Sequence, residues 1–277
     1  MKIKFAIMTT LISSILVVLH GCGSDSSNST TSSTNSSSAA TTTNLVVPVA
    51  NNGLTFELEF VDQLKLENQV TRAWDDSYQK PYIDAANKWL NALLAVEGKS
   101  HHTIRMKIYV EQLDGGNGQA GSDAEEQIGS FNFPTVGTMK IGNHTYADGF
   151  DQIEFHANIL HEMGHIIGIG SFTETFMEDH ATMKGNVLKI ENSIAAKKYN
   201  EIYNNTHKYV PLSDDGGHLY DYVLQEDARR VLDDGSILPP LTQEFMANGA
   251  VFGAVTLAVL DDIGYEVSYA GVDSYTP

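Results

Sequence analysis

Cysteine is almost absent from this chain of 277 residues, in which Cys22 is the only one. A single cysteine cannot form a disulfide within the chain, so cross-links of that kind do not hold the fold together. The fold must be held by its hydrophobic core and by any metal that it binds. The apolar fraction is average, and the length suits one large domain or two small ones.

Basic residues are also scarce. The chain has 17 lysines and arginines against 35 aspartates and glutamates, which gives a formal charge of −18. A surface of that charge repels phosphate backbones, so we expect no nucleic-acid partner. It favours basic substrates, but it is more simply the surface of a soluble protein outside the cytoplasm.

Long hydrophobic runs are missing except for Phe5 to Leu19, which follows Lys2 and Lys4. This run is too short for a comfortable membrane span and is typical of an export signal, which we place at residues 1–21. The run ends in Leu19-His20-Gly21-Cys22, which resembles the lipobox of bacterial lipoproteins. The resemblance implies a lipid on Cys22 and an address at the outer membrane or cell surface. The alternative is an ordinary secretory signal and a secreted protein.

Residues 24–43 consist almost entirely of serine, threonine, asparagine and alanine. Such a segment cannot bury a core, and we predict a disordered tether. Together with the modified cysteine it spans residues 22–44. The globular part is then expected at residues 45–277.

The first half of this globular part alternates strand and helix patterns. Alternating apolar residues predict strands at residues 54–60 and 104–110, and a shorter one at 136–141. A helix is predicted from Pro81 to Val96, with the proline in its first turn. Residues 114–121, DGGNGQAG, are expected to form a plain loop. They lack the ending of a phosphate loop, and a calcium ion there is conceivable but unsupported. This order of elements predicts a mixed α+β fold.

The segment HEMGHIIGIG at residues 161–170 contains the pattern H-E-x-x-H. Residues four apart share one face of a helix, so His161 and His165 can both bind one metal ion. Glu162 lies about 100° around the helix, where a general base for a metal-activated water is needed. Asp151 is expected to cap this helix and Gly168 to end it. Its buried apolar positions are expected to be Ile153, Leu160, Met163, Ile166 and Ile167.

A catalytic zinc ion usually has three protein ligands, so a third must come from elsewhere in the chain. The downstream histidines are His180, His207 and His218, and His218 is favoured because it follows two glycines that allow a sharp turn. A carboxylate is the alternative, from Glu191, Glu201 or Glu226. The other histidines are not expected to bind this metal. His156 faces about 140° away on the helix, and His101, His102 and His144 are expected to be solvent-exposed in or near loops.

Further along, Glu244 to Gly249 resembles a Met-turn, in which a methionine packs beneath the metal ligands. With this segment the chain resembles the leishmanolysin-type metzincins, a family of zinc endopeptidases. The resemblance covers roughly residues 100–267 and is carried by residues 161–170, Gly217-His218, 244–249 and 256–265. That family separates the helix from its third histidine by a long insertion, here residues 166–217. The compact metzincin pattern fails, since Ser171 stands where its histidine would be. Leu219 and Ala247 also depart from residues that are usual in the family.

The resemblance implies a two-lobed α+β fold. An upper lobe at about 45–170 would carry a twisted mixed sheet and the active-site helix, and an irregular lower lobe at about 171–277 would complete the cleft. It implies one zinc ion held by His161, His165 and His218, with Met246 packed beneath them. The edge strand that pairs with an extended substrate would be Val136-Gly137-Thr138-Met139. The alternative for this strand is an ordinary sheet edge.

The resulting hypothesis is a monomeric, membrane-anchored zinc endopeptidase that cleaves extracellular or envelope proteins, with Glu162 as general base. The alternative is a surface lipoprotein, an adhesin or binding protein, with a non-catalytic zinc ion on the same fold. An intact Glu162 weighs against that alternative, because a structural zinc site does not need it.

Overall fold

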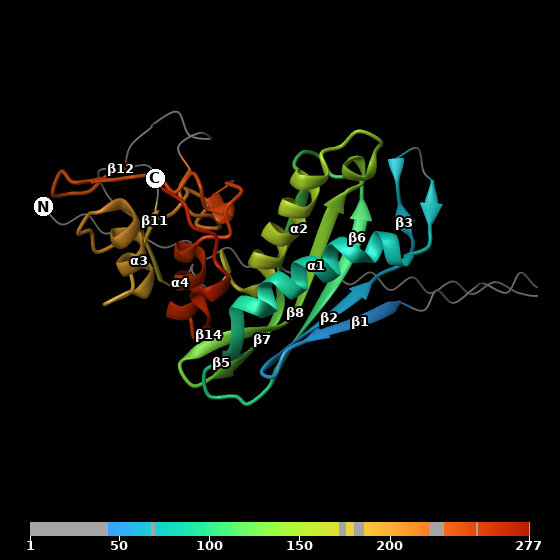
Figure 1. The fold of residues 1–277 in the computed structure, drawn as a ribbon, viewed down its shortest axis with the longest axis horizontal. Coiled ribbons are helices and arrows are strands. Elements are labelled where there is room, and N and C mark those ends of the chain that lie inside the picture. The colour runs from blue at the N-terminus through green and yellow to red at the C-terminus, as the bar shows by residue number, and fades with distance from the viewer. Residues whose placement is uncertain are drawn as a thin grey trace, which may run out of the picture. The chain divides into compact units, whose positions relative to one another are not determined.

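The computed structural model describes residues 44–67, 70–171, 176–179, 186–221, 230–247 and 249–276. The predicted signal segment, Cys22 and the tether up to residue 43 lie outside these residues. In the part that is described, the fold is mixed α+β, with a five-stranded mixed sheet and four α-helices (Figure 1). None of these helices has both the length and the apolar character that crossing a bilayer requires.

The main sheet has the strand order β1-β2-β6-β8-β7. Its strands are β1 (Leu45–Ala50), β2 (Leu54–Phe60), β6 (His102–Glu111), β8 (Phe131–Gly142) and β7 (Gly118–Ile128). The three inner strands are parallel, while β1 and β7 pair antiparallel at the two edges. Burial alternates along β2 and β6, which confirms the strands predicted at 54–60 and 104–110.

The prediction of the edge strand was wrong. Residues 136–139 belong to β8, which has a neighbour on both sides, so that Met139 pairs with Ile108 of β6 and with Ala120 of β7. The backbone of β8 is therefore occupied by ladder hydrogen bonds and cannot pair with a substrate. The edge on this side of the sheet is β7, which begins at Gly118 inside the segment expected to be a loop. No residue of β7 is buried. Its sequence therefore does not show the alternation of apolar and polar residues by which a half-buried strand is predicted.

Helices α1 (Asp76–Ala92) and α2 (Gln152–Ile167) pack against one face of this sheet, as Figure 1 shows. α1 begins earlier than predicted, because the Asp75 side chain accepts hydrogen bonds from the backbone N–H groups of Ser77 and Tyr78. Pro81 therefore lies inside the helix. α1 also ends earlier, since residues 93–96 form β5 (Leu93–Val96), which pairs with β14 (Tyr265–Val267) near the C-terminus.

Helix α2 has the ends that the sequence predicts. The Asp151 carboxylate accepts from the N–H groups of Ile153 and Glu154 at 2.7 and 3.3 Å. Gly168 ends the helix with a φ of 136°, a conformation that favours glycine. The predicted apolar positions are buried except Ile153, which is 78% exposed, because the first turn of α2 lies at the surface.

The C-terminal part contains helices α3 (Ile194–Tyr203) and α4 (Ala254–Asp262). Between and beside them are short ladders and 3-10 turns. The ladders are formed by β9 (Met177–Asp179), β10 (Asn186–Leu188), β11 (Val210–Pro211), β12 (Arg230–Val231) and β13 (Ile237–Leu238), and the turns are Phe245–Ala247 and Tyr269–Gly271. Two smaller elements of the first half are the β3 (Leu64–Lys65) and β4 (Thr71–Arg72) ladder and the turn Asn143–Tyr146.

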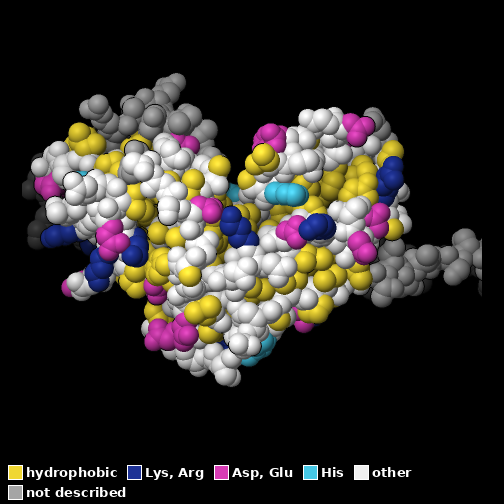
Figure 2. All heavy atoms as spheres, in the orientation of Figure 1, with side chains coloured by type: hydrophobic (Ala, Val, Ile, Leu, Met, Phe, Trp, Pro, Cys, Tyr) yellow, Lys and Arg dark blue, Asp and Glu magenta, His cyan; other side chains and the backbone are white. Residues whose placement is uncertain are grey.

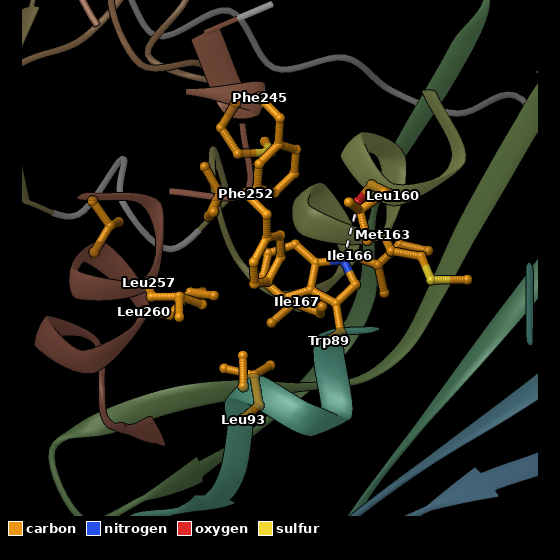
Figure 3. Close-up of a cluster of buried hydrophobic side chains, with 14 of the residues drawn as sticks. Trp89, Leu93, Leu160, Met163, Ile166, Ile167, Phe245, Phe252, Leu257 and Leu260 are labelled. Atoms are coloured by element: carbon orange, nitrogen blue, oxygen red, sulfur yellow. Dashed lines mark hydrogen bonds between the residues drawn. The ribbon is translucent and has the colours of Figure 1, made fainter. Parts of the chain in front are cut away.

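One hydrophobic core joins these parts, and Trp89 of α1 lies inside it (Figure 3). Its indole N–H donates to the Leu160 carbonyl of α2 at 3.0 Å. Its ring packs edge-on against Phe245 and Phe252 from the C-terminal part. The Tyr265 hydroxyl donates to the Ile167 carbonyl, so β14 also supports the end of α2. The core thus fixes the helix that carries the H-E-x-x-H pattern against segments distant in sequence.

The expectation of a solvent-exposed His102 was wrong. Its side chain is fully buried, because it lies two residues before Ile104 and therefore on the inward face of β6. Its two ring nitrogens lie 2.9 Å from the Glu126 carboxylate and 2.7 Å from the Pro134 carbonyl oxygen. These partners satisfy its polar atoms inside the core.

Candidate metal centre

Three histidines converge at the exposed side of α2. The Nε2 atoms of His161 and His165, one turn apart on the helix, lie 3.1 Å from each other. His218, from the segment after β11, brings its Nε2 atom to 3.1 Å from that of His161. The three ligand atoms all lie within 4.8 Å of one another. The structure therefore brings together the three histidines that the sequence singled out.

Each ring is oriented by a partner on its other nitrogen. The Nδ1 atom of His161 lies 2.8 Å from the Phe245 carbonyl oxygen, and that of His165 lies 2.9 Å from the Ile169 carbonyl oxygen. The Nδ1 atom of His218 lies 2.8 Å from the Asp215 carboxylate. These oxygens only accept hydrogen bonds, so every Nδ1 must be the protonated donor. In the neutral rings the Nε2 lone pairs then face one another.

Electrostatics keep two of these rings neutral. Burial, together with the neighbouring His165, lowers the pKa of His161 to about 3. Burial likewise lowers the pKa of His165 to about 4. The hydrogen bond from His218 holds the pKa of Asp215 well below its usual range. At neutral pH His161 and His165 therefore offer unprotonated nitrogen donors beside the ionised Asp215 carboxylate, which is the state that binds a metal ion.

The geometry fits a metal ion. Nitrogens about 2.0–2.1 Å from one tetrahedral ion are roughly 3.3 Å apart, close to the separations found here. Unprotonated nitrogens at that separation repel each other unless a cation lies between them. The cluster could therefore hold one metal ion, which would be bound by His161, His165 and His218.

Close backbone contacts bring the three ligands to one place. Gly170 has a φ of 99°, and a Cβ atom there would lie 3.0 Å from the Cα atom of Gly217. Only glycine allows the turn after α2 to approach the loop that carries His218. Similarly, a Cβ atom on Gly164 would lie 2.7 Å from the sulfur of Met246. The fully buried Met246 thus packs directly against the metal helix, and its carbonyl accepts from the Leu219 N–H at 2.9 Å.

Glu162 lies beside the histidines and is 5% exposed. Burial raises the pKa of its carboxyl from 4.5 to about 7, the range in which a group accepts and returns protons at neutral pH. Its Oε2 atom has no hydrogen-bond partner among the described residues. A carboxyl group with a pKa near neutrality and an oxygen without a hydrogen-bond partner could act as a general base.

Two cavities flank the cluster and share Gly118, Glu162 and His218 in their walls. One, of about 390 Å³, extends past His165 and Gly170, and the other, of about 570 Å³, extends past Asn158 and Phe245. Together they form a cleft along the edge strand β7, whose residues 118–120 line it. Figure 2 shows the surface hollowed in this region, with histidine (cyan) beside the hollow. The cluster is therefore accessible from both directions along the cleft.

The other candidate ligands are not part of the cluster. His207 lines a separate cavity beside α3, and Glu191 and Glu201 do not join the group. His180 and Glu226 lie outside the described residues. Sequence reasoning missed Asp215 and the Phe245 carbonyl, which orient two of the rings. Asp215 could have been found from the sequence, because it is an acidic residue three positions before a candidate ligand. The role of the Phe245 carbonyl group leaves no trace in the sequence.

We expect Asp215→Ala to weaken zinc binding about 10- to 100-fold, because the His218 ring would lose the acceptor that orients it. The measurement is competition for zinc with a chromophoric chelator. Asp234→Ala is the matched control, since Asp234 accepts hydrogen bonds from Ser236 in a similar turn but does not join the histidine cluster. An unchanged affinity of the Asp215 variant would contradict this role.

In comparisons with known proteins, no protein-family model and no curated protein matches the chain. The assignment of a function therefore depends on the arrangement of the site.

Proposed function

We propose that the protein is a zinc-dependent endopeptidase of the leishmanolysin-like metzincin type. The observation that carries the proposal is the convergence of three individually oriented imidazoles beside a buried glutamate on an open cleft. This combination matches what metal-assisted peptide hydrolysis needs: a bound cation, a base near neutral pKa and room for an extended chain.

Zinc fits the donor set, because it prefers neutral imidazole nitrogens in a tetrahedral arrangement and, when bound, would activate water and polarise a carbonyl group. The chain's own contribution to the chemistry is Glu162. Its carboxylate, beside His161 on the same helix, would take a proton from the attacking water. It would then deliver that proton to the nitrogen of the departing amine, which restores the carboxylate for the next cycle.

A catalytic role is favoured over a structural one by the number of ligands. Structural zinc sites are usually closed by four protein ligands, whereas catalytic sites have three and an open position. Among the described residues, no fourth histidine, cysteine or carboxylate joins the three histidines. The cavities on both sides of the cluster favour a role in which a substrate reaches the metal.

Strand β7 is the proposed binding edge for a peptide substrate, in place of the strand expected from the sequence. It is paired on one side only, and its residues 118–120 line the cleft beside Glu162. An extended peptide can add to such an edge through backbone hydrogen bonds. That binding mode holds the scissile bond beside the histidines without requiring a particular side chain at every position.

Gly118 is expected to be essential to this arrangement. A Cβ atom on it would lie 2.6 Å from the Cγ and Oε1 atoms of Glu162, so Gly118→Ala must displace the carboxylate. We expect kcat/KM to fall roughly 10- to 100-fold, with a change in unfolding free energy below about 1 kcal/mol. Peptide cleavage and chemical denaturation of the zinc-loaded variant measure both quantities.

Gly121→Ala is the matched control for this variant. Gly121 lies on the same strand, and a Cβ atom there would have no neighbour within 4 Å. Equal activities of the two variants would mean that the space above Glu162 is not needed.

The lipid anchor, the outer-membrane or surface location and the monomeric state remain parts of the same proposal, supported by the sequence alone. A lipid on Cys22 would hold the domain at a membrane surface, where it could reach protein substrates.

The proposal is tested by cleavage of a mixed peptide library, with products identified by mass spectrometry. We expect the zinc-loaded protein to cleave internal peptide bonds and to lose this activity when zinc is chelated. A folded protein with one bound zinc that cleaves no library member would instead favour a zinc-containing binding protein.

A further inference from the structure

One face of α2 forms a wall of the larger cavity. Its residues there are Glu154, Ala157, Asn158, His161 and Glu162. Asn158 precedes His161 by three residues and Glu162 by four, so helical geometry places it beside both. It is neither a metal ligand nor a base, and the proposed mechanism gives it no role.

The side-chain amide of Asn158 is a second unpartnered polar group in this wall, beside the Glu162 carboxylate. Its Nδ2 atom is buried and has no hydrogen-bond partner in the part of the chain that the structure describes. A neighbouring polar group is satisfied, because the Glu154 carboxylate accepts from Asn117 at 2.9 Å. A buried donor without an acceptor costs free energy, and rotation of the Asn158 amide about its χ2 bond would turn this N–H into the cavity, where an external acceptor could satisfy it.

The shape of the cleft indicates which acceptor this is. Residues 116–118, which lead into the edge strand β7, line one side of the cavity, and α2 lines another. A peptide paired with β7 is extended, and its carbonyl groups point alternately toward the strand and away from it. The carbonyl groups that do not pair with β7 need donors from elsewhere in the cleft.

We propose that Asn158 is a substrate-binding residue whose side-chain N–H donates a hydrogen bond to a backbone carbonyl oxygen of the bound peptide. This inference rests on the proposed endopeptidase function. A contact to the backbone would bind peptides of many sequences and fix their position beside Glu162. The bond forms only when substrate is present, which explains a donor left without a partner in the free protein.

The test is steady-state cleavage of one library-derived peptide by the zinc-loaded protein and by two variants, Asn158→Ala and Asn158→Asp. Both variants remove the donor, and the aspartate keeps the shape of the side chain. We expect kcat/KM to fall about tenfold in each. For the substrate-free Asn158→Ala protein we expect the zinc affinity to stay the same and the melting temperature not to fall, because no internal hydrogen bond is lost.

A binding measurement separates substrate contact from chemistry. In the Glu162→Gln background, in which the peptide should stay intact, adding Asn158→Ala is expected to raise the Kd of the same peptide about tenfold. Ile153→Ala is the control, because Ile153 lies on the same helix but outside the cavity wall. It should change neither kcat/KM nor Kd.

The outcomes are distinct. Unchanged kcat/KM and Kd in the Asn158 variants, with a parent that cleaves peptides, would overturn the role of Asn158 and leave the proposed function standing. Loss of stability or zinc affinity equal to the loss of activity would also overturn it, since Asn158 would then be structural. A parent that cleaves nothing would overturn the proposed function and this inference together.

Discussion

Replacement of Glu162 by glutamine is expected to abolish peptide cleavage while zinc remains bound. The amide has nearly the same shape as the carboxylate but cannot take a proton from water. General-base catalysis contributes about 10²- to 10⁴-fold, so kcat/KM should fall by at least that range. Zinc stoichiometry, measured by competition with a chelator, should stay at one per chain, because Glu162 is not one of the three ligands.

The same substitution should stabilise the metal-free protein at alkaline pH. Burial raises the pKa of Glu162 from 4.5 to about 7, so the fold disfavours the ionised carboxylate. Below pH 4.5 the carboxyl group is protonated in both the folded and the unfolded state, so it does not lower the free energy of unfolding. Between pH 4.5 and 7 the unfolded state ionises first, and above pH 7 the full cost of about 3 kcal/mol applies.

Denaturant unfolding of the metal-free parent and Glu162→Gln proteins at pH 8 and at pH 4 measures this effect. The variant should be more stable at pH 8, and the difference should vanish at pH 4. Glu201→Gln is the control, since Glu201 is exposed on α3 and forms an ion pair with Lys198. Retention of full activity by a zinc-loaded Glu162→Gln protein would rule out the general-base role.

Replacement of His218 by alanine is expected to have the second large effect, the loss of zinc binding. His218 is the ligand that the C-terminal part contributes, and its Nε2 atom lies 3.1 Å from the Nε2 atom of His161. The substitution removes this ligand. Zinc bound only to the folded protein stabilises it by about 4 kcal/mol when its free concentration is 1,000 times Kd. For a domain of this size that corresponds to a melting temperature about 10 °C higher.

Chelation should therefore lower the melting temperature of the parent and leave that of His218→Ala unchanged. His207→Ala is the matched control, because His207 was a rival third ligand and lines a cavity apart from the cluster. Its response to chelation should equal that of the parent. If the His207 variant lost the response and the His218 variant retained it, the assignment of the third ligand would be wrong.

The sequence alone determined the features that depend on neighbouring residues. The spacing of His161 and His165, the cap at Asp151 and the stop at Gly168 are local consequences of helical geometry, and the structure has all of them. The strands at residues 54–60 and 104–110 were equally readable, because each buries one face and alternates. The two glycines before His218 and the resemblance in the distant segments favoured it as the third ligand.

Only the tertiary structure decided which distant segments meet. Strand β8 has a neighbouring strand on each side, and β7 lies at the edge of the sheet. No local sequence pattern predicts which strand lies at the edge. The acceptors that orient the three rings, the Phe245 and Ile169 carbonyls and the Asp215 carboxylate, depend on how the backbone turns after the helix and beneath it. The unpartnered amide of Asn158 is visible only once its surroundings are known. Local sequence fixes which groups share a face, whereas pairing and burial depend on contacts between segments that are far apart in the chain.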